Sequence, residues 1–141
     1  MLGDVRKLLI PESKTPEEIK GLWEHTCFEA FVAIVDESPY HEFNFSPSGQ
    51  WAAYAFKDYR APRAWRVQSP PSVSYICTDD RLSMEVIISE NDLPDNPKHN
   101  TYRLGLAAVL ETKEGELSYW ALCHPTGKPD FHHRTGFTLS F

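Results

Sequence analysis

Alternating apolar and polar residues, interrupted at short intervals by turn-forming residues, are the feature that most restricts how this chain can fold. The alternation is clearest over residues 26–35 (TCFEAFVAIV), 40–47 (YHEFNFSP) and 50–59 (QWAAYAFKDY). A period of two places successive side chains on opposite faces of a strand, and Pro, Gly, Asn and Asp favour the turns between strands. The pattern therefore predicts an all-β sandwich or barrel with little helix.

The other elements follow from the same signals. Residues 46–49 (SPSG) favour a hairpin between the second and third segments, and residues 61–72 carry prolines that suit a loop or an edge strand. Residues 15–22 (TPEEIKGL) predict one helical turn. The remaining predicted strands are residues 6–11, the two halves of 73–89, 101–112, 116–125 and 136–141. This makes about nine strands. Because the chain shows no linker or internal repeat, we expect one domain over residues 1–141.

Charge and composition exclude several classes of function. A net charge of −6 disfavours nucleic-acid binding, which needs a basic surface to neutralise phosphates. The apolar run near the N-terminus spans only three residues, too few for a signal-peptide core or a membrane span. Three cysteines without a CxxC pair indicate reduced, mostly buried thiols. We therefore expect a soluble cytoplasmic protein without nucleic-acid or membrane partners.

Several predicted strands carry a polar residue within an otherwise apolar segment. These residues are Glu29, Glu42, Asn44 and Glu85, and Arg60 and Arg103 are candidates to oppose them. Alternation places Glu42 and Asn44 on one face of their strand, and Phe43 and Phe45 on the other. Two interpretations stay open: a solvated sheet face with weak ion pairs, or a concave polar face that binds a ligand rich in hydroxyl groups.

Residues 123–137 (CHPTGKPDFHHRTGF) hold three of the six histidines beside a cysteine and an aspartate. Their spacing does not match a zinc site, and adjacent histidines on an extended chain point in opposite directions. Neither a paired CxxC nor a GxSxG motif occurs. We therefore predict no metal, cofactor or catalytic residue here. Instead, we expect an ordered loop that brings His124, Asp130 and His132 to a binding face.

Three segments resemble the bacterial DOMON-like proteins, which are related to the family-nine carbohydrate-binding modules. They are residues 22–33 (LWEHTCFEAFVA), 40–60 (YHEFNFSPSGQWAAYAFKDYR) and 117–141 (LSYWALCHPTGKPDFHHRTGFTLSF), and the similarity extends from about residue 8 to the end. The resemblance implies an immunoglobulin-like β-sandwich that holds a sugar or a haem against one face. Similar proteins begin with additional strands before the segment that matches residues 8–11, so one sheet is expected to lack a strand.

Sugar-binding relatives hold the ring between two tryptophans and bind its hydroxyls through carboxylate, amide and arginine groups. In the similar segments, the residues of these types are Trp23, Glu29, Glu42, Asn44, Arg60 and Trp120. The resemblance thus predicts a non-catalytic module for a small carbohydrate or sugar-derived ligand. The alternatives are a haem- or metal-binding redox module, with Met84 as the only internal methionine, and an enzyme that uses the loop from His124 to His133.

Overall fold

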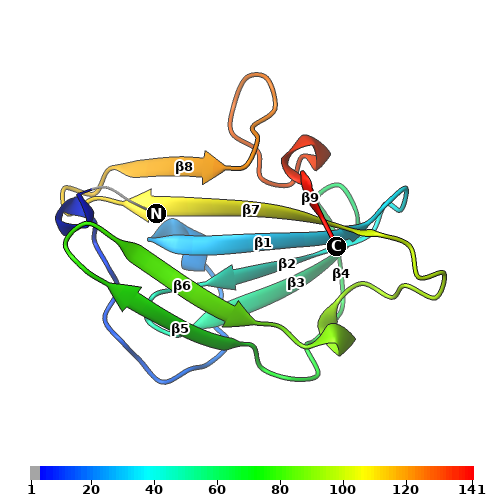
Figure 1. The fold of residues 1–141 in the computed structure, drawn as a ribbon, viewed down its shortest axis with the longest axis horizontal. Helices are drawn as coiled ribbons and strands as arrows, with labels where there is room; N and C mark the ends of the chain where they lie inside the picture. Colours follow the sequence, from blue (N-terminus) through cyan, green and yellow to red (C-terminus); the bar gives the residue numbers. More distant parts are fainter. Residues whose placement is uncertain (1–3) are drawn as a thin grey trace.

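The computed structural model describes residues 4–141 and is an all-β antiparallel sandwich, as predicted (Figure 1). Residues 1–3 of the predicted domain lie outside the described part. The nine strands are β1 (Cys27–Ile34), β2 (Tyr40–Phe45), β3 (Trp51–Asp58), β4 (Ala61–Arg63), β5 (Ser72–Cys77), β6 (Leu82–Ile87), β7 (Tyr102–Glu111), β8 (Leu117–Ala121) and β9 (Leu139–Ser140). The helices of residues 4–141 are three-residue 3-10 turns: η1 (Val5–Lys7), η2 (Leu22–Glu24), η3 (Glu90–Asp92) and η4 (Arg134–Gly136).

Two sheets of very different size form the sandwich. Seven strands make the large sheet, in the order β4-β3-β2-β1-β7-β8, with β9 paired to part of β7. The hairpin of β5 and β6 is the second sheet. Neighbouring strands in both sheets are antiparallel. The two strands β1 and β2 lie in the middle of the large sheet, so their residues are flanked by backbone on both sides.

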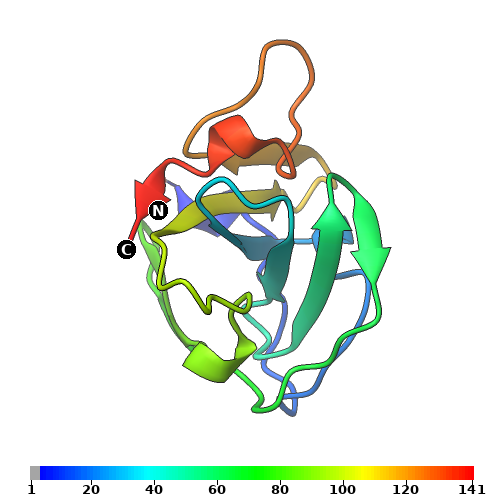
Figure 2. The same ribbon diagram turned by 90° about the vertical axis from the view of Figure 1, so that its right-hand side faces the viewer.

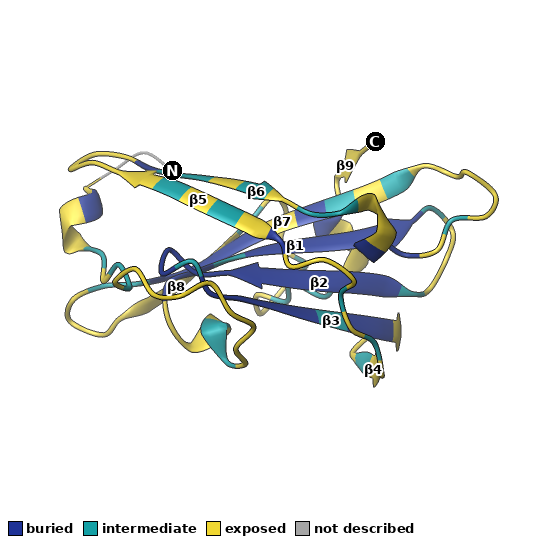
Figure 3. Cartoon of the chain, turned by 90° about the horizontal axis from the view of Figure 1, so that it is seen from below, coloured by how far each residue is buried: buried dark blue, intermediate teal, exposed yellow. Residues whose placement is uncertain are grey.

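One face of the large sheet carries the core that the alternation predicts. Phe43 and Phe45 point to this face from β2 and cluster with Val32 and Trp51. Half-buried residues of the second sheet, including Met84, pack against them. Figure 3 shows the result as continuous burial along β1, β2 and most of β3, whereas β5 and β6 alternate between half-buried and exposed. A hairpin with one covered face shows this alternation.

No second sheet of residues 4–141 covers the opposite face of the large sheet. An aromatic cluster that includes Phe31, Tyr40, Phe56 and Phe137 lies there instead. The chain after β8 crosses this side of the sheet before it returns as η4 and β9, as Figure 2 shows in orange to red. Part of this face is therefore covered by a loop, and a loop can leave space between itself and the sheet.

Predictions near the chain ends were wrong in detail. Residues 6–11 do not form a strand: η1 begins the described chain, and only Leu8 makes an isolated bridge, to Thr112. Residues 15–21 form no helical turn, and η2 begins only at Leu22. Glu18 instead makes a parallel bridge to Trp51, because the backbone there runs beside the start of β3. The proline-rich segment 61–72 supplies the short edge strand β4, which agrees with the rule that proline is tolerated at sheet edges.

The cysteines were predicted to be reduced and mostly buried. All three are free, but only Cys27 is buried, whereas Cys77 and Cys123 are exposed. Cys77 ends β5 at a turn and Cys123 follows β8, so neither has a covering element.

No helix within residues 4–141 is long and apolar enough to cross a membrane.

Candidate functional site

A cavity of about 520 Å³ lies on the side of the large sheet that faces away from the β5–β6 hairpin. Its aromatic walls are Trp23, Tyr54, Phe56, Tyr119 and Phe131. Its polar groups are Glu29, Glu42, Arg60 and His132, and Pro62, Val109 and Pro129 complete the lining. The volume and this mixture of apolar walls with a few convergent polar groups are typical of small-molecule sites.

Strand register brings the two carboxyls of the cavity together. Glu29 of β1 is in register with Asn44 of β2, and Phe31 is in register with Glu42. Glu29 and Glu42 are therefore diagonal neighbours on one face of adjacent strands, within reach of each other's side chains. Each is only 6% exposed. From the alternation, Glu29 was expected on the face of β1 opposite its apolar residues, and Glu42 and Asn44 were expected together on one face of β2. The strand register places all three residues on the same face of the sheet.

Burial makes both carboxyls weak acids. It raises the pKa of Glu29 to about 8, and the nearby Glu42 adds to the rise. Burial also raises the pKa of Glu42, to about 7, although a hydrogen bond from Asn44 and the charge of Arg60 oppose it. In that bond Asn44 Nδ2 donates to Glu42 Oε1 over 2.9 Å. Asn44 Oδ1 is buried and accepts no hydrogen bond from residues 4–141.

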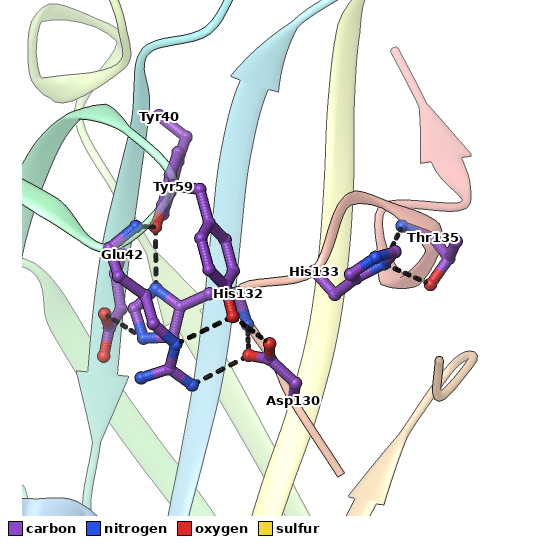
Figure 4. A network of polar contacts seen from close by, with 8 residues as sticks. Tyr40, Glu42, Tyr59, Asp130, His132, His133 and Thr135 are labelled. Atoms are coloured by element: carbon purple, nitrogen blue, oxygen red, sulfur yellow. Dashed lines mark hydrogen bonds and ion pairs between the residues drawn. The ribbon is translucent and has the colours of Figure 1, made fainter. Parts of the chain in front are cut away.

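His132 connects the loop after β8 to the floor of the cavity (Figure 4). The backbone N–H of Arg60 donates to the Tyr40 hydroxyl over 3.0 Å, and the same hydroxyl forms a hydrogen bond with His132 Nδ1, 2.8 Å away. The other ring nitrogen, His132 Nε2, points to Glu42 Oε2, at 3.5 Å. Burial, followed by the charge of Arg60, lowers the pKa of His132 to about 4, so the ring is neutral at neutral pH.

Asp130 fixes the loop against the β3–β4 turn. It accepts hydrogen bonds from the Tyr59 hydroxyl and from Arg60 Nη2, the latter over 2.8 Å. It also accepts the backbone N–H of His132, over 3.1 Å. Although burial acts in the other direction, these bonds hold the pKa of Asp130 below its ordinary value. Arg60 has a positive φ of 50°, an uncommon conformation that turns its side chain toward the loop within these contacts.

The predicted site residues divide into three groups by position. Those that line the cavity are Trp23, Glu29, Glu42, Arg60 and His132. Asn44 and Asp130 lie behind them and hold Glu42 and Arg60. Trp120 and His124 do not line the cavity: Trp120 is 58% exposed and donates to Ser118 Oγ, and His124 stacks on Phe131.

Seven lining residues of the cavity were not predicted from the sequence: Tyr54, Phe56, Pro62, Val109, Tyr119, Pro129 and Phe131. Tyr119 and Trp120 are neighbours on β8, so only one of them can face the cavity, and Tyr119 does. The alternation had separated these two side chains, but the resemblance favoured the tryptophan. Tyr54 of β3 is in register with Glu42 of β2. Its place in the cavity can be recognised only when the pairing of these two strands is known.

The remaining histidines and Met84 lie elsewhere. His133 points away from the cavity and its ring accepts the Thr135 N–H, so the two adjacent histidines diverge as predicted. Met84 packs in the core on the other face of the large sheet. Within residues 4–141, no group of three or more His, Cys, Asp or Glu side chains is arranged to hold a metal ion.

Comparison of the chain with models of protein families, with curated proteins and with solved structures gave no match.

Proposed function

We propose that this protein is a small-molecule binding module and that its ligand is a sugar or a sugar-derived compound. The observation that carries the proposal is the 520 Å³ cavity, in which aromatic rings and hydrogen-bonding side chains converge. Sugars have apolar ring faces and polar hydroxyl edges, so they need both kinds of surface. An affinity in the micromolar to millimolar range, about −8 to −4 kcal/mol, is expected for such a site.

Trp23 and Tyr119 are the candidates for stacking. They come from η2 and β8, line the same cavity and keep 46% and 47% of their surface exposed. An exposed ring face beside a cavity is available to a flat ligand, whereas the buried ring of Phe56 serves as floor. This pair replaces the two tryptophans that the resemblance suggested.

The polar groups are placed to bind hydroxyls. Glu42 and Arg60 are fixed by Asn44 and Asp130, so little side-chain freedom is lost when a ligand binds. His132 is neutral and its orientation is set by Tyr40. Groups held in this way are typical of preorganised binding sites.

Calorimetric titration with a panel of monosaccharides and disaccharides tests the proposal. Trp23→Ala should weaken binding of the best sugar at least about tenfold, because one stacking surface is lost. Trp120→Ala is the matched control: it removes a tryptophan that lies outside the cavity, so its affinity should equal that of the unaltered protein. Equal losses in both variants, or no sugar that binds, would contradict the proposal.

A further inference from the structure

The charge of Arg60 acts on Glu42, but the two carboxyls of the cavity make few direct contacts with other side chains of residues 4–141. Glu29 accepts no hydrogen bond from residues 4–141, and no lysine or arginine of this part of the chain forms an ion pair with Glu29 or Glu42. Arg60 lines the cavity, but its guanidinium is bound to Asp130 and donates to the Tyr59 hydroxyl. A buried carboxyl without a cation is largely protonated near neutral pH, as the raised pKa values of Glu29 and Glu42 indicate, and a bound cation would favour the ionised form of both.

Hydrogen-bond acceptors predominate around Glu29. Once ionised, the two carboxyls of the cavity only accept hydrogen bonds, and within residues 4–141 Glu42 Oε2 has one contact, to His132 Nε2 at 3.5 Å. Asn44 Oδ1 and the Tyr54 hydroxyl are buried without a hydrogen-bond partner among these residues, and of the two residues only Tyr54 lines the cavity. A ligand group that binds the ionised pair of carboxyls must bring several donors. A primary ammonium brings three N–H donors and a positive charge.

The aromatic walls favour the same group. Trp23 of η2 and Tyr54 of β3 meet edge to face, with ring centroids 6.2 Å apart. Tyr119 of β8 and Phe131 of the following loop also have ring centroids 6.2 Å apart. Faces of Trp and Tyr attract cations, most strongly where water is excluded. The cavity, with half-exposed aromatic walls beside two buried carboxyls, therefore has two reasons to prefer a cation over a neutral group.

We propose that the cavity selects an amine-bearing ligand, an amino sugar or another small cyclic amine, with its ammonium between Glu29 and Glu42 and its ring against Trp23 and Tyr119. This inference rests on the proposed binding function and narrows its ligand class. The ammonium replaces the missing cationic partner of the two carboxyls. A neutral sugar places no positive charge between Glu29 and Glu42.

Proton release accompanies such binding, because the ammonium favours the ionised carboxyls. The other titratable or charged side chains near the pair, within residues 4–141, are Cys27, Tyr40, Tyr54, Arg60, Tyr119, Asp130 and His132. The pKa of Tyr54 is raised to about 12 by burial, that of the Cys27 thiol is raised by burial, and that of His132 is about 4. The carboxyls are thus expected to supply the protons, and amine affinity rises by up to about tenfold per pH unit for each proton released.

Calorimetry with two matched pairs of probes tests the inference: cyclohexylamine against cyclohexanol, and glucosamine against glucose. Cyclohexylamine is about as basic as lysine and stays protonated through the range. The oxygens beside the glucosamine amine make it much less basic than lysine, so the comparison is made at about pH 6.5, where both amines are ammonium ions and the two carboxyls still hold protons to release. Each amine should then bind at least about tenfold more tightly than its neutral partner. Glu29→Gln and Glu42→Gln should each remove most of this preference. Glu85→Gln, which alters an exposed carboxyl on β6, should leave it unchanged. Runs in buffers of different ionisation enthalpy should show proton release with the amines only.

The outcomes separate the two proposals. Equal affinity for amine and neutral partner overturns this inference and leaves sugar binding standing. A preference that survives both cavity variants also overturns it. Binding of cyclohexylamine without either sugar supports recognition of the amine and contradicts the sugar part of the proposed function. Failure of all four probes contradicts both.

Discussion

Tyr40 gives His132 its orientation, and single hydrogen bonds of this kind decide the geometry of the site. Its hydroxyl accepts the Arg60 N–H and forms a hydrogen bond with His132 Nδ1, and its ring stacks on Phe56 with centroids 4.8 Å apart. Tyr40→Phe keeps the stacking but leaves the part-buried Arg60 N–H and His132 Nδ1 without this partner. We expect a loss of about 1–3 kcal/mol in the free energy of unfolding, measured with urea, and weaker ligand binding.

The control for this change is Tyr119→Phe. Tyr119 is half exposed and its hydroxyl makes no described hydrogen bond, so removal should change the free energy of unfolding by less than about 0.5 kcal/mol. If both variants lose equal stability, the Tyr40 hydroxyl does not hold the loop.

At the scale of residues, the sequence predicted well which side chains share one face of a strand. It predicted less well which face of each strand lines the cavity. Alternation placed Glu42 with Asn44 and Tyr119 opposite Trp120, and the structure confirms both. Alternation has no information on which side of β8 meets the cavity, because that depends on the loop that folds over it. The choice of Trp120 as a stacking residue therefore came from the resemblance alone, and the structure places the ring outside the cavity.

At the scale of elements, the contact between β7 and η4 positions the loop that carries His132. Gly105 lies on β7 where a Cβ atom would come within 2.7 Å of Phe137 Cδ1 and 3.2 Å of the Gly136 carbonyl. Gly105→Ala forces η4 away from the sheet, and this kind of overpacking costs about 1–3 kcal/mol. Because η4 follows His132 by one residue, we expect reduced ligand affinity as well, measured by calorimetry beside urea unfolding.

Gly115→Ala separates the two effects. Gly115 has a φ of +84° in the β7–β8 turn, and an added Cβ meets nothing within 4 Å. The substitution strains the backbone and lowers stability by about 1 kcal/mol, but it does not touch η4. Ligand affinity should therefore be unchanged in this variant. A similar drop in affinity in both variants would mean that affinity follows stability rather than the position of the loop.

Long alternating segments were predicted well, and short or irregular ones were not. β1, β2, β3, β5, β6, β7 and β8 fall within the predicted segments, because five or more alternating residues carry a strong local signal. The segment 6–11 is apolar enough for a strand, but Val5–Lys7 takes a 3-10 turn whose Val5 N–H donates to the Asp79 carbonyl. That partner lies far away in sequence, and no local pattern can show it.

At the scale of the whole molecule, the cavity is assembled from segments that only the fold brings together. Trp23, Glu29, Arg60, Tyr119 and His132 come from a 3-10 turn, two strands, a hairpin turn and a loop. The strand order β4-β3-β2-β1-β7-β8 places β1 beside β7 across more than sixty residues of chain. Such pairings depend on the balance of all contacts, so the sequence predicted the polar face but not its closure into a cavity.

The unpaired carboxyls make stability depend on pH in an unusual direction. Between about pH 4.5 and pH 8, the folded protein keeps protons on Glu29 and Glu42 that the unfolded chain has released, so stability falls as the pH rises. His132 acts oppositely between about pH 4 and pH 6.5, where only the unfolded chain binds its proton. His41, whose pKa burial also lowers, acts in the same direction as His132. Above about pH 6.5 the opposing effect of the histidines ends, and the effect of the two carboxyls on stability remains.

We therefore expect the unliganded protein to lose about 2 kcal/mol of unfolding free energy between about pH 6.5 and pH 8.5, mostly through Glu29, since each unfavourable ionisation costs about 1.4 kcal/mol per pH unit. Urea unfolding at both pH values measures this loss. Glu29→Gln cannot ionise and should remove most of the loss, whereas Glu85→Gln should retain it. An amine in the cavity should also reduce the loss, because its charge compensates the carboxylates. A stability that is flat or rises over this range would show that Glu29 is solvated or paired in solution, and the case for a cationic ligand would fall with it.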